Sequence, residues 1–465
     1  MQLADLDAAQ LAAGYAEATF TPVDVIEALD ARIAAWEPSL HALYAYDPAS
    51  ARAQAEASAR RWSDRAALGP LDGVPVSLKE LIHTRGTPTP VGTAATVLLP
   101  EPDDAPPAAR LREAGAVLFA KTTVPDFGML SSGLSSFHPL ARNPWNLANN
   151  PGGSSAGAAA AAAAGYGPLH VGTDIGGSVR LPAAWCGLVG FKPTLGRIPI
   201  DPYYTGRCAG PMTRTVDDAA RMMAVLSLPD ARDATSLPPE TIDWLAPIDG
   251  VRSLRIGVMM EAGCGMALDA EIGEAVRAAA ETFAAAGATL VEVAPVLTRD
   301  MLDGLDRFWR ARAWAEISVL PPERRALILP YILHWAESGA GVSGAQAVTG
   351  FGRTFDMRAA CGALMSSVDA VLSPTTPNLA FPAEYASPID DWQRPFEHIA
   401  YTLPWNMGEQ PAVSLNCGFS RDGTPIGLQI VTPRFADARA LQLARWYESQ
   451  RGPITDWPLP PGERC

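Results

Sequence analysis

Two serines and one lysine are the residues of this chain whose types and spacing could perform chemistry. Ser154 and Ser178 each follow a pair of glycines, and Lys79 lies upstream at the end of a short apolar stretch. A glycine pair lets the backbone adopt conformations that a Cβ atom would forbid, and it leaves N–H groups free to bind an anion. A single Gly-Gly-Ser segment is usually just a turn. Two such segments together with an upstream lysine indicate a candidate catalytic site.

A serine–lysine arrangement could cleave an amide. Such a hydrolase needs a nucleophile, a base, a proton donor for the leaving nitrogen and a site for the oxyanion. The lysine is a base only when it is neutral, so Lys79 must be desolvated or lie beside groups that disfavour its ammonium form. A serine–histidine–aspartate arrangement has less support. None of the six histidines lies in a motif that suggests it, and only His83 is near the candidate site.

The motifs around these residues resemble those of the amidase signature family, most densely from about Leu71 to Met212. The resemblance implies that Ser178 is the nucleophile, that Ser154 is a relay serine preceded by a cis peptide bond, and that Lys79 is the base. The interval of 24 residues between the two serines is the family's usual interval. Lys121 is the rival base, but its segment resembles a family segment that is not catalytic.

The resemblance also implies an oxyanion hole and a support for the relay serine. The hole would consist of backbone N–H groups, and Ser155 would assist Ser154 through hydrogen bonds. The family usually has a glycine where this chain has Ala156, which a helical backbone at that position would tolerate. The backbone donors expected in the hole are those of Ile175, Gly176, Gly177 and Ser178.

Two further groups of residues are expected around the site. By resemblance Asp174 and Arg180 hold the nucleophile loop in shape, and an ordinary structural salt bridge is the simplest form of that role. The segment 126–138 would line the acyl side of the pocket, although a flexible surface loop is the alternative. Its nearest residues to the substrate would be Met129, Ser131 and Ser132.

The elements that must position these side chains are predicted as short strands and helices. A strand ends at Lys79, further strands cover 117–122 and 169–174, and an alanine-rich segment over 158–164 predicts a buried helix because alanine is the best helix former. The N-terminal segment predicts two helices, and 298–368 is predicted to be mostly helical.

We therefore expect an α/β protein with the amidase signature fold, in which helices flank a central mixed β-sheet on both sides. A single amidase domain over 1–465 is expected. It would comprise an N-terminal helical flank (1–66), a signature core (67–226) and a helical substrate-side region (298–368).

Composition limits the partners of this chain. Hydrophobic residues make up 48% and charged residues 18%, as in a globular protein with a large core. The net charge of −14 argues against nucleic acid and membranes as partners. The six cysteines show no metal-ligand spacing, which predicts free thiols. The acidic N-terminus does not resemble a secretory signal. We expect a cytoplasmic protein without metal or cofactor, and a homodimer is compatible with the sequence.

The predicted function is hydrolysis of a small-molecule amide, aryl amide, ester or carbamate through a serine acyl-enzyme. The alternative is the glutaminase subunit of a glutamyl-tRNA amidotransferase, which the chain resembles over the same core. That subunit normally has a tyrosine-rich helical segment, and residues 330–339 contain one tyrosine. This mismatch favours a stand-alone hydrolase. The aromatic residues over 298–368 favour an apolar or aryl substrate, and one or two of them are expected to contact it.

Overall fold

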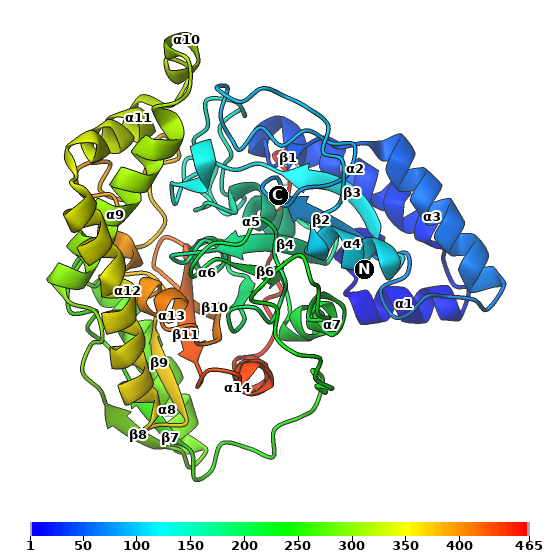
Figure 1. Ribbon diagram of the computed structural model, residues 1–465. Coiled ribbons are helices and arrows are strands. Elements are labelled where there is room, and N and C mark those ends of the chain that lie inside the picture. Colours follow the sequence, from blue (N-terminus) through cyan, green and yellow to red (C-terminus); the bar gives the residue numbers. More distant parts are fainter. Residues whose placement is uncertain (1, 463–465) are drawn as a thin grey trace.

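The computed structural model describes residues 2–462, and its eleven strands pair into one mixed sheet (Figure 1). The strand order is β1-β3-β2-β4-β6-β5-β10-β11-β9-β7-β8. Pairing is parallel within β3-β2-β4 and within β9-β7-β8, and antiparallel from β4 through β9. The strands are β1 (Leu43–Tyr44), β2 (Pro75–Lys79), β3 (Val117–Thr122), β4 (Leu169–Asp174), β5 (Val189–Lys192), β6 (Cys208–Thr213), β7 (Arg255–Val258), β8 (Thr289–Glu292), β9 (Ala370–Pro374), β10 (Ala412–Phe419) and β11 (Pro425–Val431).

Helices cover both faces of this sheet, which confirms the predicted fold class. The N-terminal helices α1–α3 lie at the β1 side, and α9, α11 and α12 lie at the opposite side of the molecule (Figure 1). The α-helices are α1 (Ala8–Ala16), α2 (Pro22–Leu40), α3 (Pro48–Ser63), α4 (Pro106–Glu113), α5 (Ala156–Ala164), α6 (Arg180–Cys186), α7 (Val216–Leu226), α8 (Ala270–Ala285), α9 (Arg299–Ile317), α10 (Pro322–Arg325), α11 (Pro330–Glu337), α12 (Gly344–Met365), α13 (Leu403–Met407) and α14 (Asp437–Arg451).

Strand β4 shows how the two layers are formed. Leu169 and Val171 alternate along the strand and join the core beneath α7, because successive side chains of a strand point to opposite faces. Helix α5 is buried along its whole length. Its methyl side chains let it approach the rest of the fold closely. At Gly157 a Cβ atom would lie 2.1 Å from the carbonyl oxygen of Ala42, so only glycine fits there. Ala156 is buried and lies in the first turn of α5, and this is the helical backbone at which alanine was expected to replace the family's glycine.

Most predicted elements around the site are present. The strand ending at Lys79 and the strands over 117–122 and 169–174 have the predicted bounds. The region 298–368 contains α9 to α12, as predicted. The cysteines within residues 2–462 are all free, and Cys465 lies outside the described residues. No helix within this range is both long enough and apolar enough to cross a membrane.

Candidate active site

Lys79 is the last residue of β2, and its amine is enclosed by the protein. Its side chain is fully buried, and Nζ is hydrogen-bonded to Oγ of Ser154 at 2.7 Å. Nζ also donates to the carbonyl oxygen of Thr173 on the neighbouring strand β4 at 3.3 Å. A neutral amine can make both contacts, because its lone pair accepts from the serine hydroxyl while an N–H donates to the carbonyl.

The surroundings of Lys79 favour this neutral form. Burial lowers the pKa of its amine well below the ordinary value, and the positive charge of Arg207 lowers it further. Asp174 and Glu80 oppose this shift but do not reverse it. A desolvated lysine of this kind can accept a proton near neutral pH.

The peptide bond between Gly153 and Ser154 is cis. The Gly-Gly-Ser segment that contains this bond contacts the second Gly-Gly-Ser segment, which ends at Ser178. The N–H of Ser155 donates to the carbonyl oxygen of Ser178 at 3.3 Å. The hydroxyl of Ser155 lies 3.3 Å from both the N–H and the carbonyl of Thr173. Two loops 24 residues apart in the sequence therefore meet beside the end of β4.

A buried ion pair holds the loop that carries Ser178. Arg180 and Asp174 are both inaccessible to solvent, and the guanidinium donates to both carboxylate oxygens, at 2.9 and 3.0 Å. Burial alone would raise the pKa of Asp174, but Arg180 and the amide of Asn406 hold it well below its usual range. The carboxylate also accepts from the N–H of Gly177 at 2.8 Å. These contacts fix the loop from within.

Ser178 is the part of this loop that faces open space. It is partly exposed, and its hydroxyl has no hydrogen-bond partner among residues 2–462. The N–H groups of Ile175, Gly176 and Ser178 likewise have no acceptor within the described part of the chain. Free donors beside a free hydroxyl could stabilise an oxyanion that forms on attack by that hydroxyl.

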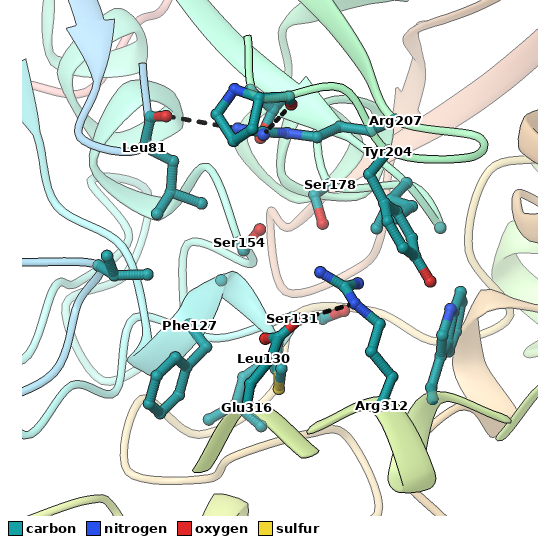
Figure 2. A pocket seen from close by; sticks show the side chains of 18 of the residues that line it. Leu81, Phe127, Leu130, Ser131, Ser154, Ser178, Tyr204, Arg207, Arg312 and Glu316 are labelled. Carbon is teal, nitrogen blue, oxygen red and sulfur yellow. Dashed lines mark hydrogen bonds and ion pairs between the residues drawn. The ribbon is translucent and has the colours of Figure 1, made fainter. Parts of the chain in front are cut away.

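Ser154 and Ser178 line one cavity of about 330 Å³ (Figure 2). Its walls include the segment after β3, the loop before β6, helices α6, α9 and α11, and residues 396–399. Most of its larger side chains are apolar or aromatic, namely Phe127, Leu130, Leu181, Trp309, Trp335, Phe396 and Ile399. Its ionisable side chains include Arg207, Arg312, Glu316 and His83. Among residues 2–462, no group of three or more His, Cys, Asp or Glu side chains is placed to hold a metal ion.

The sequence profile of the family described as Amidase matches residues 24–441. The chain belongs to the amidase family. Among curated relatives, a subunit of glutamyl-tRNA(Gln) amidotransferase from Chloroflexus aggregans is 36% identical and is matched over 94% of both chains. The corresponding subunit from Myxococcus xanthus is also 36% identical, over 97% of this chain and 98% of its own length.

Solved amidase structures have the same fold. A bacterial aryl acylamidase of the amidase signature family superposes with a TM-score of 0.90, at 27% identity and with 99% of each chain covered. The 6-aminohexanoate cyclic dimer hydrolase gives a TM-score of 0.88, also at 27% identity, over 98% of this chain and 99% of its own. Because these structures cover nearly the whole chain, this protein is an amidase signature amidohydrolase acting on C–N bonds.

The structure of this amidase brings most of the predicted site residues together. Ser154, Ser178, Ile175 and Gly176 line the cavity, as do Met129 and Ser131. Lys79 lies behind Ser154 and reaches the cavity through it. Lys121, the rival base, is buried and does not line the cavity.

Two predicted residues are placed differently. Ser132 does not line the cavity, because its hydroxyl is turned inward, donating to the carbonyl of Tyr385 at 2.8 Å and accepting from the amide of Asn150 at 2.7 Å. Gly177 does not offer its N–H to the cavity, because that group donates to Asp174. No hydrogen bond joins the hydroxyls of Ser154 and Ser178 within the described residues. Of the two contacts that the expected relay needs, the structure therefore contains the one between Lys79 and Ser154.

The charged wall of the cavity was not predicted from the sequence. Arg312 and Glu316 follow Trp309 on α9 at helical spacing, so the three share a face. That spacing could have indicated them. Of the aromatic residues singled out over 298–368, Trp309 and Trp335 line the cavity. Arg207 lies directly before β6, and no local pattern marked it.

Proposed function

We propose that this amidase hydrolyses a small-molecule amide through an acyl-enzyme on Ser178, with Ser154 as proton relay and Lys79 as base. The observation that carries the proposal is the buried Lys79 amine, which lies 2.7 Å from the hydroxyl of Ser154. Burial lowers the pKa of that amine and so favours the form that accepts a proton, and Ser154 lines the same cavity as the partly exposed Ser178.

The acylation step follows from this geometry. The Oγ atom of Ser178 attacks the carbonyl carbon while its proton passes to Ser154, whose own proton passes to Nζ of Lys79. The electron pair of the carbonyl bond moves to the oxygen, where the N–H groups of Ile175, Gly176 and Ser178 stabilise the charge. When the C–N bond breaks, the relay returns the proton to the leaving amine. Catalytic hydrogen bonds often tighten only in the substrate complex, which accounts for the open contact between the two serines.

Deacylation uses the same proton path, from the attacking group through Ser154 to Lys79. A water molecule takes the place of the amine and gives a proton to Lys79 through Ser154 as it attacks the ester carbon. The C–Oγ bond then breaks, the proton returns to Ser178, and a carboxylic acid is released.

An apolar or aryl amide fits the cavity best. Aromatic and aliphatic side chains from the segment after β3, from α6, α9 and α11, and from residues 396–399 make up most of its larger lining side chains. The similarity to a solved aryl acylamidase over the whole chain supports this substrate class. We further propose that the catalytic unit is one domain over the whole chain and acts in the cytoplasm, alone or as a homodimer.

The second candidate function is that of a glutaminase subunit in a tRNA-dependent amidotransferase. The 36% identity to two glutamyl-tRNA(Gln) amidotransferase subunits over nearly the full length favours it. In that case the chain would release ammonia from glutamine within a complex, whereas a stand-alone hydrolase needs no partner chain.

The test is amide hydrolysis by the purified chain alone, with 4-nitroacetanilide and glutamine offered separately. Release of 4-nitroaniline that Ser178→Ala abolishes supports the stand-alone function. Glutamine hydrolysis without aryl amide hydrolysis supports the glutaminase role. Lys79→Met should also abolish turnover, and Lys121→Met is its matched control because Lys121 is another buried lysine, located outside the cavity. Full turnover by Ser178→Ala would overturn the mechanism.

A further inference from the structure

The cavity has a charge balance opposite to that of the whole chain. The chain has a net charge of −14. Among the side chains that line the cavity, two are guanidinium groups, Arg207 and Arg312, and one is a carboxylate, Glu316. Burial lowers the pKa of His83, which keeps this fourth group neutral at neutral pH. A local excess of positive charge in an acidic protein attracts an anionic ligand to that place.

Arg207 forms no salt bridge within residues 2–462, although Asp201 is near enough to act on its charge. The guanidinium of Arg207 donates to two backbone carbonyl oxygens, at 2.8 Å to Pro202 and at 3.3 Å to Leu81. Burial and the charge of Arg312 lower its pKa to about 10 against the opposing charge of Asp201, so it stays charged at neutral pH. A buried guanidinium without a salt-bridge partner is stabilised when a ligand supplies a carboxylate.

Arg312 reaches into the cavity from α9. Its Nε donates to Glu316 one turn further along the helix, at 2.9 Å. Its Cζ lies 3.7 Å from the centre of the Tyr204 ring, which holds the guanidinium plane over the aromatic face. Figure 2 shows this guanidinium directed from the helix toward the space in front of Ser178.

We propose that this amidase selects amides that carry a carboxylate group, and that Arg312 and Arg207 bind this group in the cavity. Guanidinium groups are suited to this role because their planar donors match the geometry of a carboxylate. The rest of the substrate is apolar, since aromatic side chains form much of the remaining wall. The inference rests on the proposed function and specifies its substrate class.

The test compares three chromogenic amides that differ only in charge and its position. Butyryl 4-nitroanilide is neutral, succinyl 4-nitroanilide carries a carboxylate on the acyl side, and the butyryl amide of 5-amino-2-nitrobenzoate carries it on the leaving group. We expect one of the two acidic amides to exceed the neutral amide in kcat/KM by about tenfold or more, the range of a charge-assisted hydrogen bond. Which one does so tells on which side of the scissile bond the guanidiniums act.

Three variants of α9 test whether Arg312 causes the preference. Arg312→Gln should reduce the ratio of kcat/KM for the preferred acidic amide to that for the neutral amide by about tenfold. Glu316→Gln should raise this ratio, because it removes the carboxylate that competes with the substrate. Arg307→Gln is the matched control, since Arg307 is exposed on the same helix and does not line the cavity. It should leave the ratio unchanged.

The outcomes separate the inference from the proposed function. If all three amides are hydrolysed in a Ser178-dependent way but neither acidic amide is preferred, the inference is wrong and the proposed function stands. The same holds if the preference exists but survives Arg312→Gln. If none of the three amides is hydrolysed, the proposed function fails, and the inference fails with it.

Discussion

The amine of Lys79 lies 2.7 Å from the hydroxyl of Ser154 and has no access to solvent. A lysine that acts as a base needs a lowered pKa and a path for the proton, and this contact bears on both. Burial lowers the pKa of the amine well below its ordinary value, and the contact gives it a path to the cavity through Ser154. Changes at these two residues and their neighbours should therefore alter the pH dependence of hydrolysis, the rate of hydrolysis and the free energy of unfolding.

The pH dependence of hydrolysis should follow the protonation of Lys79. In the proposed mechanism the neutral amine is the active form, so kcat/KM for a neutral amide should rise with pH through a pKa well below that of an ordinary lysine. Arg207→Met removes a positive charge that lowers this pKa, so the rising limb should move to higher pH. The measurement is kcat/KM from pH 5 to 10 for both proteins. An unchanged profile in the variant would show that another group titrates.

Lys79 should also reduce the stability of the fold at neutral pH. Between its lowered pKa in the folded state and about 10.4 in the unfolded state, the unfolded chain binds one more proton, so the free energy of unfolding rises with pH by up to ~1.4 kcal/mol per unit. Lys79→Met lacks this term. Its free energy of unfolding relative to wild type should therefore be highest near neutral pH and decrease toward pH 10, as measured by urea unfolding.

Lys121→Met separates the effect of a buried lysine on stability from an effect on hydrolysis. Burial lowers the pKa of Lys121 to about 8, so it contributes its own pH-dependent term, and its loss should leave hydrolysis intact. Loss of hydrolysis in Lys121→Met with a native fold would contradict the assignment of the base.

The two serines should differ in how much activity they contribute. Ser178→Ala removes the attacking atom and should reduce kcat by at least about 10⁴-fold. Ser154→Ala removes a proton relay and should reduce kcat by about 10²- to 10⁴-fold. A burst of product at high enzyme concentration checks whether the acyl-enzyme still forms in Ser154→Ala. Equal activity of Ser154→Ala and wild type would exclude the relay.

The buried pair of Asp174 and Arg180 should stabilise the loop that carries Ser178 only as a pair. Arg180→Gln leaves a buried carboxylate without its counter-ion and should lower the free energy of unfolding by about 3–5 kcal/mol at pH 7. The pKa of Asp174 is lowered in the folded state, so the contribution of its charge is present above about pH 4 and is lost as pH falls through the folded pKa. The loss in Arg180→Gln should shrink accordingly in acid.

A double-mutant cycle checks the coupling. Asp174→Asn combined with Arg180→Gln should cost less than the sum of the two single variants, because the double variant leaves no unpaired charge. Additive losses would mean that the two side chains stabilise the loop independently.

The sequence by itself determined the local features of this amidase. The strands ending at Lys79 and at Asp174 have the predicted bounds, because short buried apolar runs next to turn residues specify strands locally. The resemblance pointed to the same two serines and lysine that the structure places around the cavity. The region 298–368 was likewise predicted to be mostly helical, and it contains α9 to α12.

Only the tertiary structure decided which groups face the substrate. The N–H of Gly177 is directed to Asp174, and the hydroxyl of Ser132 to Tyr385, because loops are fixed by hydrogen bonds that residue spacing does not encode. Arg207 and Arg312 are separated by about a hundred residues and meet at one cavity. The lowered pKa of Lys79 arises in the same way, since it requires burial by several elements together, and burial is a property of the packed fold.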